Sequence, residues 1–384
     1  MRIAFFAPGG FSLTFGNTKN RIELSEALTK LGWECFLITG QEVLSNYGST
    51  RKADYKEALK SYLTENAEKY DVVLYEFDSL PYDRSLFSKT TLFVARPALL
   101  GSDLHNIEIP LNIKAKVRTL VERLLSKLVS AKAERKKQSI QDMHTSFANC
   151  DVIQVQNTVD ASLLVKMGHS PEKIALVPNG ISDERFSLFQ SIKRDYSREL
   201  TIAFVGTFDF RKGAMDFPYI VSKVYKMYPG TKFKLLGTKG LFATQEQVYR
   251  FFPKKLHSLI TVIPTFDPME LPALLQDCHL GIFPSYHESF GFGALEMMCA
   301  GLPVVAYRAA GPGDFIIPEL LVDIGDKITF ANKVLELIQN KERLQALGYH
   351  AQKICKKYRW SLIAVKAAEE YTRRRENLLQ SDLV

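Results

Sequence analysis

A short apolar run, a loop carrying glycine or proline, and a helical pattern follow one another repeatedly along this 384-residue chain. The runs are apolar at every position instead of alternating, as expected for parallel strands covered on both faces. The first series predicts strands at residues 2–7, 33–38, 72–77, 92–95, 152–155 and 175–177, and the second at 201–205, 233–236, 261–263, 280–283 and 304–306. Two such series predict two doubly wound α/β domains, in which ligands lie outside the carboxyl ends of the strands.

The polar stretch 187–199 separates the two series and has no sustained period, so we expect a linker there. The expected domains are residues 1–187 and 200–359. A long helical pattern over about 360–384 is expected to pack back on the first domain. The chain length also fits two domains.

Composition excludes several classes of protein. The chain is 46% hydrophobic and 24% charged, as in ordinary globular proteins, and no apolar run is long enough to span a membrane. Its five cysteines include no Cys-x-x-Cys pair, which disfavours a zinc site or a disulfide framework. We therefore expect a cytoplasmic protein, or one at the cytoplasmic face of a membrane.

The segment 280–306 reads as strand, loop, helix and strand, with Glu288 on the loop and Glu296 on the helix. Gly291 and Gly293 leave backbone N–H groups at the helix start open to a ligand, and the helix dipole favours negative charge there. Carboxylates accept hydrogen bonds from vicinal diols. Both glutamates can therefore reach the hydroxyls of a sugar nucleotide, although a pair of glutamates at this spacing also arises by chance in a chain of this length.

This segment resembles the retaining glycosyltransferases of family 4, which have the GT-B fold of two Rossmann-like domains. The matching residues are Pro284-Ser285, Glu288-Ser289-Phe290-Gly291, Glu296-Met297-Met298-Cys299-Ala300-Gly301 and Pro303-Val304-Val305-Ala306. The resemblance implies that Glu288 approaches the transferred sugar and that Glu296 holds the ribose hydroxyls of the nucleotide. It further implies donor-binding roles for Ser289, Phe290, Gly291 and Phe292.

The loop Val205-Gly206-Thr207-Phe208-Asp209-Phe210-Arg211-Lys212-Gly213 resembles the family's Gly-Arg-Leu-x-x-x-Lys-Gly loop. By that resemblance Lys212 binds the donor diphosphate and neutralises the charge that grows on the leaving group, with Gly206 and Thr207 also on the donor side. Thr207 stands where the family usually has arginine, and Arg211 is the candidate to compensate. A surface Lys-Gly helix start is the alternative interpretation of Lys212.

In the N-terminal part, Gly16-Asn17 follow the first strand, where the family uses a glycine-rich loop to approach the diphosphate and the acceptor. Neither a dinucleotide fingerprint nor a Walker loop is present, which disfavours NAD enzymes and P-loop kinases. Many family members place a histidine just past the fourth strand, but here Arg96 occupies that position. Asp103 and His105 are tentative acceptor-side substitutes, and His287 is another candidate that could simply orient its loop.

A basic segment accounts for most of the net charge of +8. Residues 113–137 hold nine lysines and arginines against two glutamates, beside a helical stripe of apolar residues. One interpretation is a contact with an anionic membrane surface, and the other is a stripe packed on the domain core with solvated lysines. Nucleic acid is disfavoured because no aromatic residues are interleaved with the basic ones.

Together these features predict an α/β protein with two Rossmann-like doubly wound domains facing a central cleft. The resemblance implies that the fold is of the GT-B type, with 1–187 on the acceptor side and 200–359 binding the nucleotide-sugar. The resemblance implies a retaining transfer of sugar from a UDP- or GDP-sugar to an acceptor hydroxyl, by front-face attack in which the leaving phosphate takes the proton. A lipid-linked or cell-surface glycan is a candidate acceptor. No cofactor is expected, and because the chain has no Asp-x-Asp pair, no metal is expected either. The alternatives are a GT-B sugar-nucleotide epimerase and a donor-binding protein without turnover.

Overall fold

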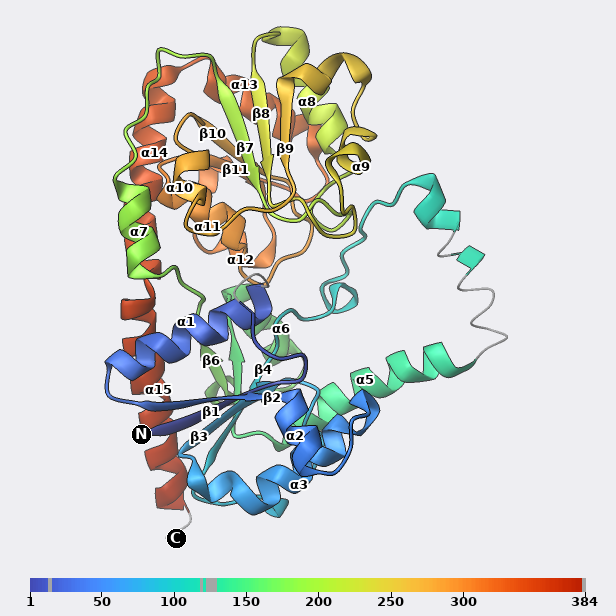
Figure 1. Ribbon diagram of the computed structural model, residues 1–384, viewed down its shortest axis with the longest axis vertical. Helices are drawn as coiled ribbons and strands as arrows, with labels where there is room; N and C mark the ends of the chain where they lie inside the picture. The colour runs from blue at the N-terminus through green and yellow to red at the C-terminus, as the bar shows by residue number, and fades with distance from the viewer. Residues whose placement is uncertain (13–15, 118–119, 122–129, 382–384) are drawn as a thin grey trace. The chain divides into compact units, whose positions relative to one another are not determined.

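The computed structural model describes residues 1–12, 16–117, 120–121 and 130–381 (Figure 1). The chain forms two compact units. The first unit comprises Met1–Leu100, Val117–Gly180 and Trp360–Val384, and the second comprises Gly101–Lys116 and Ile181–Arg359. Both units are therefore assembled from separate stretches of sequence.

The first unit contains a six-stranded sheet in the order β2-β1-β3-β4-β5-β6, in which all neighbouring strands are parallel. The strands are β1 (Arg2–Ala7), β2 (Glu34–Thr39), β3 (Val72–Glu76), β4 (Leu92–Arg96), β5 (Val152–Val155) and β6 (Ile174–Leu176). Every residue of β4 and β5 is buried, which explains why these runs are apolar throughout.

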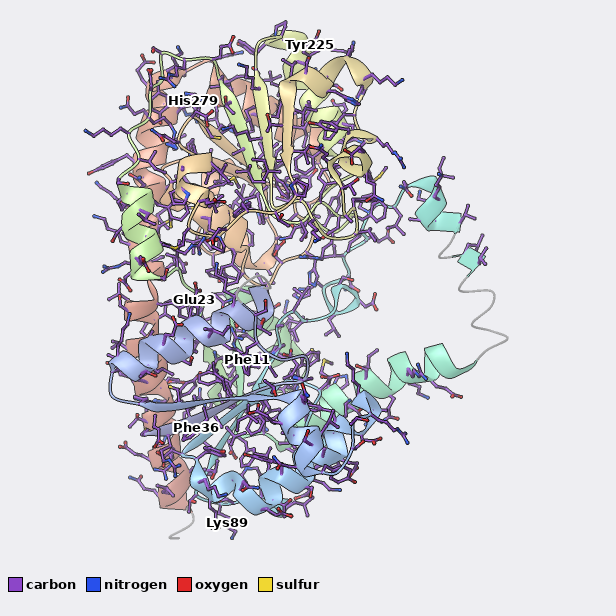
Figure 2. The ribbon with its side chains drawn as sticks, in the orientation of Figure 1. Phe11, Glu23, Phe36, Lys89, Tyr225 and His279 are labelled. Carbon is purple, nitrogen blue, oxygen red and sulfur yellow. The ribbon has the colours of Figure 1, made fainter. Side chains whose placement is uncertain are left out.

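Helices surround this sheet: α1 (Gly16–Lys30), α2 (Gly40–Asn46), α3 (Tyr55–Asn66), α5 (Ser130–Asn149), α6 (Thr158–Lys166) and α15 (Trp360–Ser381). The C-terminal helix α15 packs beside α1 (Figure 1). The indole N–H of Trp360 donates to Glu23 of α1, which is labelled in Figure 2, at 2.7 Å. The fully buried Tyr371 donates to Gln154 of β5. Helix α15 is thus part of the core of the first unit.

The second unit contains another six-stranded parallel sheet, in the order β12-β11-β10-β7-β8-β9. Its strands are β7 (Thr201–Val205), β8 (Lys232–Leu236), β9 (Ile260–Ile263), β10 (Leu280–Phe283), β11 (Val304–Tyr307) and β12 (Leu321–Val322). Its helices are α7 (Asp183–Gln190), α8 (Phe217–Met227), α9 (Gln245–Tyr249), α10 (Leu271–Leu274), α11 (Phe292–Cys299), α12 (Ala310–Gly313), α13 (Lys327–Ile338) and α14 (Lys341–Cys355). All eleven predicted strands are present with ends within one residue of the prediction, and only the two-residue β12 was not predicted.

The expected linker at 187–199 is wrong. Helix α7 extends through its first residues, and Arg194 donates to four backbone carbonyls of the second unit, those of Leu275, Cys278, Ala300 and Gly301. His279, labelled in Figure 2, contacts the carbonyl of Asp195 at 3.0 Å. Arg194 thus satisfies backbone carbonyls of the second unit, a role that a polar linker-like composition does not reveal.

The basic segment is described only in part, since 118–119 and 122–129 lie outside the described residues. Four residues of its apolar stripe are exposed, namely Ile113, Val117, Leu120 and Val121, whose exposed fractions run from 46% to 80%. Its last residues, from Ser130 onward, belong to α5. Among the described residues, no helix combines the length and the apolar character needed to span a bilayer.

Candidate functional site

Two loops of the second unit meet at the carboxyl ends of the neighbouring strands β7 and β10. The backbone N–H of Tyr286 donates to the carbonyl of Arg211 at 2.8 Å. Gly213 has φ +86°, and a Cβ there would lie 2.2 Å from the carbonyl oxygen of Pro284. Glycine is therefore required for this close approach, which fixes the Arg211-Lys212 loop against the loop that carries Glu288.

Glu288 is the centre of a buried cluster, in which its Oε1 accepts from Lys212 Nζ, from Arg211 Nη1 at 3.1 Å and from the Ser285 hydroxyl at 2.6 Å. Glu288 is 7% and Lys212 9% exposed. The ammonium of Lys212 also lies 4.9 Å from the ring centre of Phe283. The structure thus brings together all three residues that the sequence assigned to catalysis.

Burial and neighbouring charges have opposite effects on the pKa values of Glu288 and Lys212. Burial alone raises the pKa of Glu288, but Lys212, Arg211 and the hydrogen bond from Ser285 outweigh it and hold the pKa below its usual 4.5. Burial and the charge of Arg211 hold the pKa of Lys212 below its usual value, although Glu288 raises it. An anion that approaches Lys212 would stabilise its ammonium form.

A second buried group, which we call the Asp216 clamp, holds the Glu288 loop in place. The hydroxyls of Tyr286 and Tyr307 both donate to Asp216 Oδ2, at 2.6 and 2.7 Å. Asp216 precedes α8, Tyr286 lies two residues before Glu288, and Tyr307 ends β11. Burial and Asp216 hold the pKa of Tyr307 and of Tyr286 above their usual value, so both phenols remain donors. Sequence reasoning missed this clamp, because its members are up to 91 positions apart.

Helix α11 begins directly after the loop, with Gly291 at φ +92° and Phe292 as the first helical residue. A Cβ on Gly293 would lie 1.9 Å from the carbonyl oxygen of Val205, so this glycine lets α11 lie directly on β7. The ring of Phe290 is buried against Phe315 and Tyr358. The side chain of Phe290 is therefore a core contact, and Ser289 beside it is buried as well.

Glu296 lies on α11 and accepts from Arg185 Nη2 of α7 at 2.5 Å. Both side chains are buried, with 8% of Glu296 and 4% of Arg185 exposed. Nε of Arg185 also donates to the carbonyl of Pro268 at 3.4 Å. Sequence reasoning missed Arg185, which is 111 positions away from Glu296 and gave no signal by spacing.

The remaining predicted residues of the β7 loop have local partners. Gly206 adopts φ +144°, and the hydroxyl of Thr207 donates to Asp209 at 2.8 Å. Asp209 also accepts from the backbone N–H of Lys212 at 2.9 Å. Arg211 contacts Glu288 and donates to the carbonyl of His287 at 2.7 Å, so its guanidinium is directed at the Glu288 cluster.

The tentative acceptor-side residues occupy the short turn Ser102–His105, which belongs to the second unit. The His105 ring lies 5.1 Å from the ring of His287, next to Glu288 in sequence, and Asp103 lies in the same turn. Gly16 and Asn17 begin α1 of the first unit. The described residues contain no group of three or more His, Cys, Asp or Glu side chains placed to hold a metal ion.

The second unit resembles a known family of proteins. Residues 188–354 match the family model of glycosyl transferases group 1. A D-inositol 3-phosphate glycosyltransferase of Corynebacterium diphtheriae is 26% identical over 241 residues, which cover 58% of this chain and 56% of the relative. The chain spans about half the length of the curated relatives that it matches.

Solved structures match over nearly the whole chain. Sucrose-phosphate synthase from Thermosynechococcus elongatus has a TM-score of 0.71 at 18% identity, covering 97% of this chain and 98% of that one. Anabaena HepE in complex with UDP-glucose has a TM-score of 0.66 at 14% identity, covering 97% and 100%. With the two parallel six-stranded sheets, this similarity confirms the predicted α/β fold of the GT-B type.

Proposed function

We propose that this chain is a retaining glycosyltransferase of the family 4 type, which transfers a sugar from a nucleoside-diphosphate sugar to an acceptor hydroxyl. The observation that carries the proposal is the buried contact of Glu288 with Lys212 and Arg211, at the carboxyl ends of β7 and β10. It lies within the segment that matches the glycosyl transferases group 1 model.

In the proposed mechanism, Lys212 and Arg211 bind the donor diphosphate. As the bond between the sugar and the phosphate breaks, negative charge grows on the leaving oxygen, and the two cations stabilise it. The acceptor hydroxyl attacks from the face that the phosphate leaves, and the phosphate oxygen takes the hydroxyl proton, so no separate general base is needed. These cations supply the charge that a metal ion would otherwise supply, and we propose no cofactor.

Glu288 has two roles in this proposal. Without a donor it neutralises Lys212, which would otherwise be a buried ammonium without a counter-ion. When the diphosphate takes over Lys212 and Arg211, the carboxylate is released toward the sugar hydroxyls. Glu296 would hold the ribose hydroxyls of the nucleotide, and Arg185 would fix its orientation.

Similar proteins support a nucleotide-sugar donor. HepE was solved with UDP-glucose, and we therefore favour a UDP-sugar over a GDP-sugar. The acceptor hydroxyl would belong to a glycan or a lipid-linked sugar. The exposed apolar residues Ile113, Val117, Leu120 and Val121 beside Lys114 and Lys116 support a peripheral contact with the anionic inner face of a membrane. Sedimentation with anionic but not with neutral vesicles tests that contact, and equal sedimentation with both would reject it.

A thermal-shift screen with UDP, GDP and ADP tests the donor, because a nucleotide that binds the native state raises the unfolding temperature. Glu296→Ala is expected to weaken nucleotide binding, whereas Glu288→Ala is expected mainly to slow transfer. If both variants keep full activity, the site assignment is wrong. Incubation with donor alone separates the epimerase alternative, which would yield an isomerised sugar nucleotide.

A further inference from the structure

A buried arginine lies at the carboxyl edge of the first unit's sheet. Arg96 is the last residue of β4, and only 2% of it is exposed. Its Nη1 donates to Asn20 Oδ1 of α1 at 3.0 Å, and its Nη2 donates to Asn179 Oδ1, after β6, at 2.7 Å. Its Nε is buried without a hydrogen-bond partner among the described residues.

Arg96 also makes no ion pair with a carboxylate in the part of the chain that the structure describes, since its two hydrogen-bond partners are neutral amides. The other buried guanidinium here, that of Arg21, is paired with Glu76 Oε2 and donates to the carbonyl of Phe6 at 3.0 Å. The second oxygen of Glu76 accepts from the N–H of Ala98. The pair of arginines thus shares one carboxylate, which is already engaged.

Such an arrangement costs folding free energy. Charged groups are almost never buried unless they are paired, and an unpaired one is strongly destabilising. Burial, followed by the charge of Arg21, lowers the pKa of Arg96 to about 10, which still leaves it protonated at neutral pH. A destabilising residue of this kind is typical of a functional site, where stability is sacrificed for binding.

The position of Arg96 and Arg21 agrees with a ligand site. In the order β2-β1-β3-β4-β5-β6 the direction of winding reverses at β1 and β3, and doubly wound sheets bind ligands at this point, outside the carboxyl ends of the strands. Arg21 bridges the ends of these two strands through Phe6 and Glu76. Arg96 ends β4, the next strand of the sheet.

We propose that Arg96, together with Arg21 and Asn20, forms an anion-binding subsite in the first unit that recognises a phosphate or carboxylate group of the acceptor. This inference rests on the proposed function, and it assigns the acceptor of that transfer to the class of anionic, phosphate- or carboxylate-bearing molecules. A planar guanidinium matches the paired oxygens of such groups. An anionic oxygen is also a stronger acceptor than the amide oxygens of Asn20 and Asn179. It would therefore accept the hydrogen bonds that Arg96 now donates to these two amides.

Phosphate chemistry could also come from the donor diphosphate. We assign the subsite to the acceptor because the second unit holds separate cations, Lys212 and Arg211, for the donor. All residues that the proposed mechanism assigns to the donor belong to the second unit. The experiment therefore needs one arm for each source.

The test is thermal unfolding of the full chain with inorganic phosphate, with glucose 6-phosphate and with UDP, each against sodium chloride of equal ionic strength. At about five times its Kd, a ligand is expected to raise the unfolding temperature of a unit of this size by about 2–4 °C. Arg96→Met should lose the response to phosphate and to glucose 6-phosphate, and should unfold without ligand at or above the wild-type temperature. Lys212→Met should keep both responses and lose that to UDP.

Arg84→Met is the matched control, because Arg84 is ion-paired with Asp151 at 2.9 Å and donates to backbone carbonyls of the first unit. It should unfold at a lower temperature and keep the phosphate response. The inference is overturned if wild type does not respond to phosphate or glucose 6-phosphate, or if Arg96→Met responds as wild type does. Should Arg96→Met not fold, Arg96→Lys must show a reduced response, and an unchanged one rejects the subsite. A missing UDP response in wild type instead counts against the proposed function.

Discussion

Replacing Tyr307 by phenylalanine removes one hydroxyl from the Asp216 clamp and leaves the packing of the ring unchanged. The lost hydrogen bond runs from the phenol to a carboxylate at 2.7 Å, where 4% of Asp216 and none of Tyr307 is exposed. Hydrogen bonds to charged groups contribute about 1.5–3 kcal/mol, and no cavity forms, so we expect a loss of about 2 kcal/mol. For a unit of this size, that corresponds to a fall in Tm of about 4–8 °C.

Urea unfolding of the full chain measures this loss, with Tyr349→Phe as the control. Tyr349 is 62% exposed, and its replacement is expected to change the free energy of unfolding by less than about 0.5 kcal/mol. The double variant Tyr286→Phe/Tyr307→Phe should lose more unfolding free energy than the two single variants together, because Asp216 then accepts a hydrogen bond from neither phenol. The reasoning is refuted if Tyr307→Phe is as stable as Tyr349→Phe.

Two further predictions concern the Glu288 cluster and the helix behind it. Glu288→Gln leaves Lys212 without its carboxylate and should cost about 3 kcal/mol at neutral pH. The folded-state pKa of Glu288 lies below its usual 4.5, so the stability that its carboxylate contributes is complete above about pH 4.5 and is lost as the pH falls through the lowered pKa. A difference in unfolding free energy between variant and wild type that stays constant down to about pH 2 would contradict this. Gly293→Ala should lower the unfolding temperature strongly, because the new Cβ would lie 1.9 Å from the carbonyl oxygen of Val205. Gly230→Ala is the control, since no atom lies within 4 Å of the position of its Cβ, and it should not lower the unfolding temperature. Equal unfolding temperatures of the two variants would disprove the close approach.

The strands and the β7 and β10 loops could be predicted from the sequence because both depend on local patterns. A buried parallel strand is apolar at every position, and 201–205 and 280–283 were located without error. The contact of Glu288 with Lys212 follows from the fold, because these loops end neighbouring strands and their residues must therefore meet.

The partners of these residues could not be predicted, since they depend on tertiary packing. Arg185 reaches Glu296 from helix α7, whose last residues the sequence analysis assigned to a linker. In the sequence Asp216 is an ordinary acidic residue near a helix start, and only the fold brings the hydroxyl of Tyr307 to its carboxylate. The turn that holds His105 precedes the second series of strands by about a hundred residues, yet it belongs to the second unit.

Helix α15 completes the first unit although it is translated after the whole second unit. Trp360, Ala364 and Tyr371 fill the core beside α1 and β5, and at most 2% of each is exposed. A nascent chain that has emerged from the ribosome as far as residue 359 therefore carries a first unit with an uncovered apolar surface. The second unit can therefore be complete while the first still lacks its last helix.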